Sequence, residues 1–537
     1  MKNLLYRART SPVPLVLFVA FLCVFNLMAF QGPLLEYALT VSDFSKSHGY
    51  VQIASLQIVQ VTLLAASLFL FATISVLAMR VLAILLNSCN AAALYFMTMF
   101  SIDIDRSMIA NFFNTDFREA SELWHPSSLL FLLGLGLLPA TFICLLRVSA
   151  PKRLWRMAYA ICATGILTLW LAVTSYTFLW YDQHATQMGS KVLPWSYIVN
   201  TARHFNSAAM NGRKQILLPN ATFIHDSPVQ KEIVILVIGE ALRADHLNLL
   251  GYNRDTNPFT KNLGIIAFPI GESCATNTIG STACILTHEG RTASSRTNFE
   301  TLPSYLTRHG VETIFRSNNS GPPPVNVDTY QTAENLFNAC SGQTCPDKVR
   351  DGALNLGLRE LLEGTVSNRV FVTIHQSGSH GPAYYSKYPD DFEFFTPVCK
   401  TVQIANCSQQ ELINAYDNTI RYTDSLLADL ISQLDKIPNS NSVLIFVADH
   451  GQSLGEGGYY LHGAPMAFAP PEQTRVPFLV WMSDGFKSER GLSSSAILRP
   501  ETYPHDFPFH SVMGAFGLTS KIYKPEFDIF NPTGGAK

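Results

Sequence analysis

Five apolar segments fill the first third of the chain, and each is long enough to cross a bilayer as a helix. A membrane-spanning helix needs ~20 apolar residues. The segments cover about residues 12–31, 51–79, 80–100, 127–147 and 154–176. Buried core helices are a poorer interpretation of runs this long, and the first run exceeds the usual apolar core of a signal peptide. The sequence therefore predicts a five-helix transmembrane domain over residues 1–176.

Positive charge sets the expected orientation of these helices. Lysine and arginine gather on the cytoplasmic side of membrane helices. They occur before the first span and between the fourth and fifth, at Lys2, Arg7, Arg9, Arg147, Lys152, Arg153 and Arg156. The N-terminus is therefore expected to be cytoplasmic. With five spans, everything after about residue 177 lies on the opposite side of the membrane.

The rest of the chain divides into a connector, 177–230, and a domain, 231–537. The connector carries scattered aromatic residues between Tyr181 and Phe205 and is expected to include a helix on the membrane surface. In the domain, strands alternate with helices, which predicts an α/β fold with a mostly parallel sheet flanked by helices. The expected strands are 232–238, 311–316, 370–374, 442–448 and 477–481, and the expected helices are 300–309, 352–363 and 410–435.

Ten cysteines separate into two groups. Cys23, Cys89, Cys144 and Cys162 lie in the predicted spans, where a thiol behaves as a small apolar group. The other six form close-spaced pairs, which favours disulfides in an oxidising compartment over reduced thiols. No CxxC spacing supports a zinc ribbon. Six cysteines allow 15 pairings in principle, and neighbour pairing predicts Cys274–Cys284, Cys340–Cys345 and Cys399–Cys407.

Metal-ligand residues follow two of the predicted strands. The apolar run 232–238 ends in Gly239-Glu240, and the run 442–448 ends in Asp449-His450. The carboxyl ends of parallel strands meet at one edge of a sheet, where chemistry collects. Carboxylates and imidazoles are zinc ligands, and zinc in proteins usually has four ligands. Two carboxylates and one imidazole therefore leave the fourth position open. An Asp-His pair alone could cap a strand, but the second acidic strand end favours a metal-dependent enzyme that handles phosphate.

A hydroxyl-rich loop between Cys274 and Cys284 offers a nucleophile. Thr276, Thr278, Ser281 and Thr282 are all candidates, with simple helix capping as the alternative for each. A hydroxyl at a helix start benefits from free N–H groups that favour phosphate, and metal coordination activates it. Three histidines, His375, His380 and His462, lie in glycine-rich loops. They could bind a second metal or protonate a leaving group.

Four ordered motifs resemble the lipid A phosphoethanolamine transferases, a family that includes the mobile colistin-resistance enzymes. They are Gly239–His246 with Gly251–Pro258, the Cys274–Cys284 loop, His375–Pro382, and Asp449–Glu456 with Tyr460–Gly463 and Ala467–Pro470. The resemblance covers the whole chain, the five spans included. It implies an alkaline phosphatase/sulfatase-like domain in the periplasm, anchored in the bacterial inner membrane.

The resemblance also implies roles for individual residues. Thr278 becomes the nucleophile, and the ligands of one tight zinc site become Glu240, Thr278, Asp449 and His450. His380 and His462, with His375 close by, correspond to histidines that hold the head group or a second, weaker zinc ion. Ser320 and the set Asn111, Thr115 and Glu119 correspond to substrate-binding residues, although these three could also form a polar helix face. Two positions depart from the family: Pro323 where some relatives carry a substrate-binding lysine, and Gln452 where many carry glutamate.

The resemblance thus implies zinc-dependent transfer of phosphoethanolamine from phosphatidylethanolamine to a lipid A phosphate through a phosphoethanolamine adduct on Thr278, which would confer resistance to polymyxin and other cationic peptides. Another envelope glycan as acceptor and a phosphoglycerol transferase are the alternatives among enzymes. A sulfatase is disfavoured because no Cys-x-Pro-x-Arg motif occurs. A membrane sensor or scaffold is the non-enzymatic alternative. The net charge of −2 argues against a nucleic-acid partner, and a monomer in the lipid bilayer is expected.

Replacing both Asn111 and Glu119 by alanine is expected to impair transfer without removing zinc. If these residues hold the lipid head group, they act through positioning, which supplies a large part of such catalysis. Zinc content measured beside the transfer rate tests this. Full activity in the double variant would return Asn111, Thr115 and Glu119 to a solvated helix face.

Overall fold

The chain forms two compact units in a computed structural model. The described residues are 12–42, 44, 47–100, 102–105, 108–109, 112–113, 125–211, 215–225, 228–293, 299–319, 322–341, 345–402, 404–493, 497–498 and 502–531. Of these, the residues up to Ile109 and those from 125 to Arg203 belong to the first unit. Residues 112–113 and the residues from His204 onward belong to the second.

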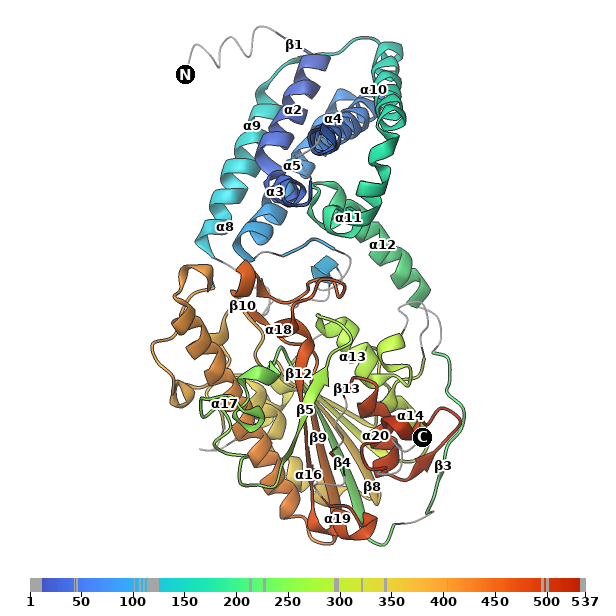
Figure 1. Cartoon of the computed structure of the whole chain (residues 1–537), viewed down its shortest axis with the longest axis vertical. Helices are drawn as coiled ribbons and strands as arrows, with labels where there is room; N and C mark the ends of the chain where they lie inside the picture. The colour runs from blue at the N-terminus through green and yellow to red at the C-terminus, as the bar shows by residue number, and fades with distance from the viewer. Residues whose placement is uncertain are drawn as a thin grey trace. The chain divides into compact units, whose positions relative to one another are not determined.

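The first unit is a bundle of apolar helices (Figure 1). Four stretches are long and apolar enough to cross a membrane: Gly49–Ile74, Val76–Phe100, Pro126–Leu145 and Arg153–Val173. A fifth candidate is a pair of helices, α2 (Leu15–Phe30) and α3 (Gly32–Val41), bent by 66°. If the bent pair counts as one span, the described residues contain the five spans expected. The helices that form the four single stretches are α4 (Ser47–Ile74), α5 (Val76–Phe100), α8 (Pro126–Phe131) with a π-helical turn Leu132–Leu137 and α9 (Leu138–Leu145), and α10 (Arg153–Val173).

The break between the second and third spans differs from the expected position at Met79-Arg80. Helix α4 ends at Ile74, and the Ser75 hydroxyl accepts a hydrogen bond from the amide of Ala78 at 2.9 Å, which caps the start of α5. Arg80 lies inside α5 and donates to the carbonyl of Leu146, just after α9 ends. A charged side chain thus sits within a span because it satisfies a carbonyl at a helix end.

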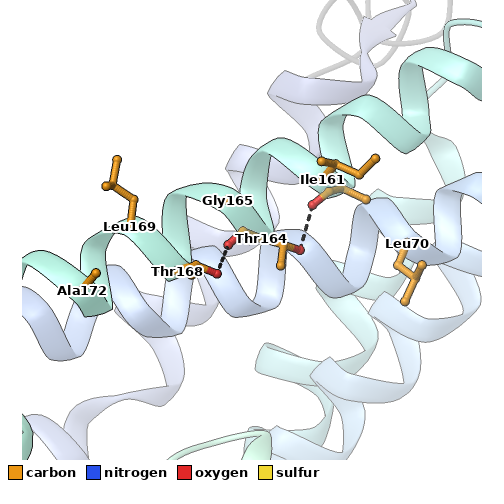
Figure 2. Close-up of a pocket in the computed structure, with 8 residues that line it drawn as sticks. Leu70, Ile161, Thr164, Gly165, Thr168, Leu169 and Ala172 are labelled. Atoms are coloured by element: carbon orange, nitrogen blue, oxygen red, sulfur yellow. Dashed lines mark hydrogen bonds between the residues drawn. The ribbon is translucent and has the colours of Figure 1, made fainter. Parts of the chain in front are cut away.

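One face of α10, beside Leu70 of α4, carries two threonines, Thr164 and Thr168, among small and apolar residues. The hydroxyl of Thr164 donates to the carbonyl of Ala160 at 2.9 Å, and that of Thr168 donates to the carbonyl of Thr164 at 3.0 Å (Figure 2). Because both hydroxyls donate to carbonyls of their own helix, neither needs a hydrogen-bond acceptor outside it. Threonines therefore fit a membrane-spanning helix here.

The first helix of the connector packs within the first unit, so that unit extends beyond the expected boundary at residue 176. Helix α11 (Phe178–Lys191) buries Trp180 and Met188 in a cluster with Leu34 and Leu56. Helix α12 (Trp195–Asn211) follows it. Trp180 and Met188 of α11 therefore contribute to the internal packing of the first unit, and a helix of the connector on the membrane surface stays a prediction.

The second unit is built on an eight-stranded sheet with the strand order β13-β5-β12-β9-β4-β8-β6-β7 (Figure 1). All neighbouring strands are parallel except the two pairs that involve β12. The strands are β4 (Lys231–Gly239), β5 (Ile266–Glu272), β6 (Glu312–Ser317), β7 (Thr329–Thr332), β8 (Arg369–His375), β9 (Ser440–Ala448), β12 (Arg475–Met482) and β13 (Tyr503–Pro504). The mostly parallel sheet is confirmed, and all five expected strands are present.

Helices flank this sheet, as expected. They are α13 (Thr278–Leu286), α14 (Leu302–Arg308), α15 (Ala333–Ala339), α16 (Leu358–Gly364), α17 (Gln409–Asp435), α18 (Pro471–Thr474), α19 (Asp484–Arg490) and α20 (Phe507–Ala515). Short strand pairs join β1 (Val13–Pro14) to β2 (Val148–Ser149), β3 (Thr222–Phe223) to β14 (Leu518–Thr519), and β10 (Ser453–Leu454) to β11 (Tyr460–Leu461). Helix α17 begins with a reciprocal capping box between Ser408 and Glu411.

The register of the central strands determines where the site forms. Gly239 of β4 is aligned with Ala448 of β9, and Ile238 of β4 is aligned with His375 of β8. These strands consist mainly of buried β-branched and aromatic residues, because both faces of the sheet are covered. Their carboxyl ends therefore meet at one edge, and the residues that follow them are brought together.

Asp424→Ala is expected to destabilise the second unit by about 2–4 kcal/mol, because it leaves several buried donors without a partner. Asp424 of α17 is 2% exposed. It accepts hydrogen bonds from the side chain of Asn257, the hydroxyl of Thr260 and the amides of Phe259 and Thr260. Urea unfolding measures the change. Ser425→Ala on the same helix is the control and should change stability by less than about 0.5 kcal/mol; equal effects would contradict the prediction.

Candidate active site

Glu240, Asp449 and His450 lie side by side at the carboxyl edge of the sheet. The amide of Asp449 donates to the carbonyl of Gly239 at 2.9 Å, which extends the pairing of β4 and β9 by one residue. The amide of Ala241 donates to Oδ1 of Asp449 at 3.0 Å, and Ala241 has a φ of 55°. A left-handed alanine is strained, and such strain collects at functional sites. Here it turns the chain sharply after Glu240 and fixes both carboxylates.

Thr278 is the first residue of α13, and its side chain reaches Glu240. Asn277 caps the helix by accepting from the amide of Gly280 at 2.9 Å. The hydroxyl of Thr278 donates to Oε2 of Glu240 at 3.1 Å. The other three candidate hydroxyls bond to backbone carbonyls: Thr276 to Ala464, Ser281 to Ala275 and Thr282 to Thr278. The structure thus separates Thr278 from the alternatives that the sequence left open.

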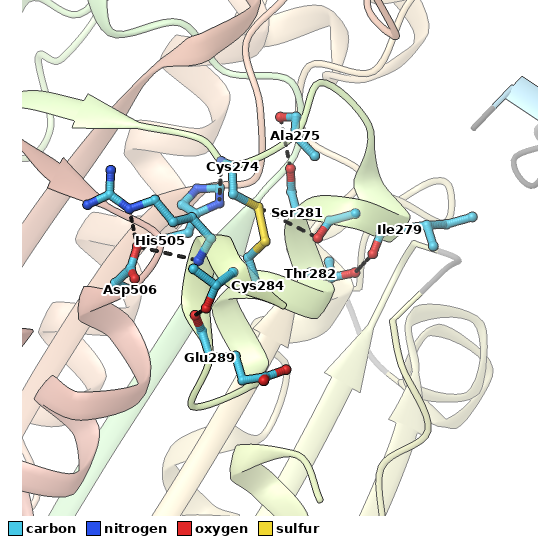
Figure 3. Close-up of a disulfide and its surroundings, with 12 residues drawn as sticks. Cys274, Ala275, Ile279, Ser281, Thr282, Cys284, Glu289, His505 and Asp506 are labelled. Carbon is cyan, nitrogen blue, oxygen red and sulfur yellow. Dashed lines mark hydrogen bonds and ion pairs between the residues drawn. A yellow bond between two sulfur atoms is a disulfide. The ribbon is translucent and has the colours of Figure 1, made fainter. Parts of the chain in front are cut away.

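All three expected disulfides are present. The Cys274–Cys284 disulfide joins the start of the loop that leads into α13 to Cys284 within that helix (Figure 3). The other two are Cys340–Cys345 and Cys399–Cys407. The first disulfide ties the beginning of the Thr278 loop to the helix that Thr278 starts, which restricts where the hydroxyl can lie.

Three buried electron-rich atoms face one another in this site. Nδ1 of His450 is 2.9 Å from the carbonyl of Gly451 and donates to it, so Nε2 carries the lone pair. That Nε2 lies 3.3 Å from Oε1 of Glu240 and 3.4 Å from Oδ2 of Asp449. None of these three atoms has a hydrogen-bond partner among the described residues. Mutual repulsion would be relieved by one cation, and the donor set fits a metal ion such as zinc.

The pKa values at the site follow from burial. All three side chains are fully buried. Burial, and the nearby Asp449 carboxylate, raise the pKa of Glu240 well above its usual value. Burial raises the pKa of Asp449 to about 7 and lowers the pKa of His450. A metal ion would hold the carboxylates ionised and the imidazole neutral, the forms that bind metal.

Two more histidines, His462 and His380, lie near His450. The ring of His462 lies 4.2 Å from that of His450 and 5.3 Å from that of His380, centroid to centroid. Ligand atoms of Glu240, His450 and His462 lie within 4.8 Å of one another, so His462 could hold a metal together with the other two. Burial lowers the pKa of His380 to about 3 and that of His462 well below its usual value. Both rings are therefore neutral at neutral pH.

Gln452 holds His462 in place. Its Oε1 lies 2.8 Å from Nδ1 of His462, and its Nε2 donates to the hydroxyl of Tyr384 at 2.7 Å. A glutamate here would place a charge beside the imidazole. The neutral amide of this chain supports the ring without adding one.

Sequence reasoning missed two residues that support the site. Asn319 follows β6 and donates to Oε2 of Glu240 at 2.7 Å. Asp351 is 6% exposed and accepts from the amides of Ser377 and Gly378, at 2.9 and 2.7 Å, and from the side chain of Asn318 at 2.7 Å. Asn318-Asn319 could have been found, because it is a polar pair directly after a strand of the same sheet. Asp351 comes from a short helical turn without such a signal.

Other predicted site residues lie apart from this network or outside the described residues. His375, the last residue of β8, is fully buried and its Nδ1 is 3.4 Å from the hydroxyl of Ser317. Burial lowers its pKa to about 3. Its role stays a prediction. Ser320, Asn111, Thr115 and Glu119 fall outside the part of the chain that the structure describes.

Known families account for most of the chain. Residues 232–518 match the sulfatase family, and residues 61–209 match the family described as "Phosphoethanolamine transferase EptA/EptB". The chain is 32% identical to phosphoethanolamine transferase EptA of Helicobacter pylori, over 93% of this chain and 94% of that protein. It is also 32% identical to phosphatidylethanolamine transferase Mcr-1 of Escherichia coli, over 74% of this chain and 77% of that protein.

A solved structure has the same architecture over nearly the whole length. It is the integral membrane protein lipooligosaccharide phosphoethanolamine transferase A (EptA) from Neisseria meningitidis. The match has a TM-score of 0.86 and 27% sequence identity, and covers 97% of this chain and 99% of that chain. Both the helical first unit and the sheet-based second unit are therefore shared with a membrane protein.

Asp351→Ala is expected to lower the free energy of unfolding by about 2–4 kcal/mol and to reduce activity at temperatures where the chain stays folded. Without the carboxylate, two amides of the loop before His380 and the side chain of Asn318 lose their acceptor. Urea unfolding and a rate measurement on the folded variant test both parts. Asp347→Ala, which removes an exposed partner of Arg350, is the control. Wild-type stability and rate in Asp351→Ala would show that this anchor is dispensable.

Proposed function

The chain belongs to the phosphoethanolamine transferase family, and we propose that it moves phosphoethanolamine from phosphatidylethanolamine to a phosphate group of lipid A. The relatives' names support the donor and the acceptor class: one is called a phosphatidylethanolamine transferase and another a lipooligosaccharide phosphoethanolamine transferase. We further propose that the second unit faces the periplasm, because the basic residues before the first span and between the last two favour a cytoplasmic N-terminus.

One observation carries the proposed chemistry: the hydroxyl of Thr278 bonds to Glu240 next to three inward-facing, unpartnered metal-ligand atoms. We assign Glu240, Thr278, Asp449 and His450 as the residues that hold zinc. A zinc ion bound there would lower the pKa of the threonine hydroxyl and offset negative charge on the phosphoryl oxygens. The second, weaker zinc position would involve His380 and His462.

The first half of the proposed reaction forms a covalent intermediate on Thr278. Its oxygen attacks the phosphorus of phosphatidylethanolamine, the bond between phosphorus and the diacylglycerol oxygen breaks, and diacylglycerol leaves after gaining a proton. Glu240 accepts the hydrogen bond of the Thr278 hydroxyl and is placed to take its proton. Thr278 is the first residue of α13, and the N-terminal end of a helix favours a phosphate on such a residue.

The second half returns Thr278 to its starting state. A phosphate oxygen of lipid A loses its proton and attacks the same phosphorus, the bond to Thr278 Oγ1 breaks, and Oγ1 takes up a proton to become the hydroxyl again. His380 and His462 are neutral. Nδ1 of His462 donates to Oε1 of Gln452, so its Nε2 carries the lone pair and can accept a hydrogen bond or a proton from the incoming oxygen. The product carries an ammonium group, which offsets a negative charge of lipid A and weakens binding of cationic peptides such as polymyxin.

Another envelope glycan is the second candidate acceptor, and phosphoglycerol transfer is the second candidate reaction. The family match to phosphoethanolamine transferases at residues 61–209 favours phosphoethanolamine over phosphoglycerol. A sensor or scaffold would not need the Thr278–Glu240 contact. Partners are therefore a phospholipid donor, a glycolipid acceptor and the surrounding bilayer, with the chain acting as a monomer.

Thr278→Ala is expected to abolish transfer while the chain stays folded, because a methyl group can neither attack phosphorus nor bind metal. Mass spectrometry of lipid A from cells that express the chain measures transfer, and metal analysis of the purified protein measures zinc. Ser281→Ala is the matched control, because its hydroxyl bonds to the Ala275 carbonyl of the same loop. Unchanged lipid A modification by Thr278→Ala would move the assignment to another hydroxyl.

A further inference from the structure

His505 connects two parts of the candidate active site that come from different strands. It follows β13 and is fully buried. Its Nε2 lies 3.0 Å from the carbonyl of Ala448, the residue before Asp449. Its Nδ1 lies 3.4 Å from the amide of Cys274, which begins the loop that leads to Thr278 (Figure 3). One imidazole therefore bonds to the segment of a proposed metal ligand and to the segment of the proposed nucleophile.

The partners of His505 determine its tautomer. A carbonyl oxygen only accepts a hydrogen bond, so Nε2 carries the proton. A backbone amide only donates, so Nδ1 carries the lone pair. Burial lowers the pKa of His505 to about 4. The ring is therefore neutral at neutral pH, in the one form that satisfies both partners at once.

The neighbouring residue, Asp506, bonds to the chain that follows α13. Asp506 pairs with Nε of Arg291 at 3.2 Å and accepts from the amide of Arg291 at 3.4 Å. Arg291 lies in a short helical turn, Gly290–Thr292, that follows α13. Gly290 lies so close that a Cβ atom there would come within 2.5 Å of the Asp506 carboxyl carbon. His505 thus bonds to the chain before α13, at Cys274, and Asp506 bonds to the chain after α13, at Arg291. The Cys274–Cys284 disulfide links the loop before α13 to the helix itself.

We propose that His505 is a positioning residue for Thr278, one that keeps the Thr278 loop in register with the end of β9. This rests on the proposed role of Thr278 as nucleophile. The loop is tied at each step: His505 at Cys274, the Ala464 carbonyl at Thr276 and the Asn277 cap at the start of α13. Without the first of these bonds, the loop can move relative to Glu240, and a shift of about 1 Å at reacting atoms can cost ~100-fold in rate.

The metal ligands are expected to be less sensitive to His505. Oδ1 of Asp449 is fixed by the amides of Ala241 and His450, at 3.0 and 2.7 Å. The amide of Asp449 also bonds to the carbonyl of Gly239. Loss of His505 should therefore separate nucleophile placement from metal binding, which a general loss of structure would not do.

Two substitutions in the full chain test the inference. His505→Leu removes both hydrogen bonds. His505→Gln keeps an amide whose oxygen and nitrogen flank one carbon, as the two ring nitrogens flank Cε1, so it can still accept from Cys274 and donate to Ala448. The readouts are the rate of diacylglycerol release from phosphatidylethanolamine in detergent, its KM, the phosphoethanolamine adduct on Thr278 and the zinc content.

We expect His505→Leu to lower kcat by roughly 10- to 100-fold with KM changed less than about twofold and zinc retained, and His505→Gln to stay within about threefold of wild type. His510→Leu is the matched control. That histidine is also buried and accepts from a backbone amide, that of Lys524, but lies within α20. It should keep wild-type kcat.

Wild-type kcat in His505→Leu would overturn the inference, and so would equal losses in the leucine and glutamine variants or loss of zinc in step with kcat. If the leucine variant does not fold, His505→Asn replaces it, because its shorter amide cannot reach both partners. It should lose kcat where glutamine does not, and equal kcat in the two would overturn the inference. Absence of a Thr278 adduct in the wild type would instead overturn the proposed function, so the two failures are distinguishable.

Discussion

The alignment of β4 with β9 forces two carboxylates and an imidazole into contact, and the rest of the site depends on that repulsion being compensated. Gly239 is opposite Ala448, so Glu240, Asp449 and His450 leave the sheet at one point. Burying such groups without a counter-charge costs several kcal/mol for each ion. The surrounding sheet must supply this energy through its apolar strands, which are almost completely buried. A fold that tolerates this arrangement is one in which a cation completes it.

Each of the three proposed metal ligands is fixed through one side-chain atom and directs another toward the centre of the site. Glu240 receives hydrogen bonds from Asn319 and Thr278 on Oε2 and keeps Oε1 without a partner. Asp449 receives two amides on Oδ1, and His450 donates from Nδ1 to the Gly451 carbonyl. Supporting bonds of this kind orient metal ligands and preserve their geometry. In all three side chains one atom is held by a hydrogen bond and another is left without a partner, although the residues follow two different strands.

Much of the sheet could be predicted from sequence, because its central strands are uninterrupted apolar runs. The strands that escaped prediction lack that signal: β5 contains Pro269 and Gly271, β7 spans Thr329–Thr332, and β13 is Tyr503–Pro504. The proposed ligand positions were predicted from the residues directly after β4 and β9, and the structure brings these residues together. Asp351 and His505 could not be found that way, because they reach the site through bonds to backbone groups that no residue pattern records. The misplaced break between two spans has a related cause: Arg80 looks like a loop residue until the Leu146 carbonyl that it satisfies is seen.

The choice among four hydroxyls shows what structure adds to a motif. By composition, Thr276, Thr278, Ser281 and Thr282 are equivalent, since each stands near the start of a helix. A hydroxyl that donates to a backbone carbonyl is committed to the fold, because breaking the bond leaves a buried acceptor unsatisfied. Three of the four are committed in this way. Thr278 donates instead to the carboxylate of Glu240, so its proton already points to a group able to accept it. Thr278, the proposed nucleophile, differs from the other three hydroxyls in the acceptor of its hydrogen bond, and that acceptor, Glu240, lies 38 residues earlier in the chain.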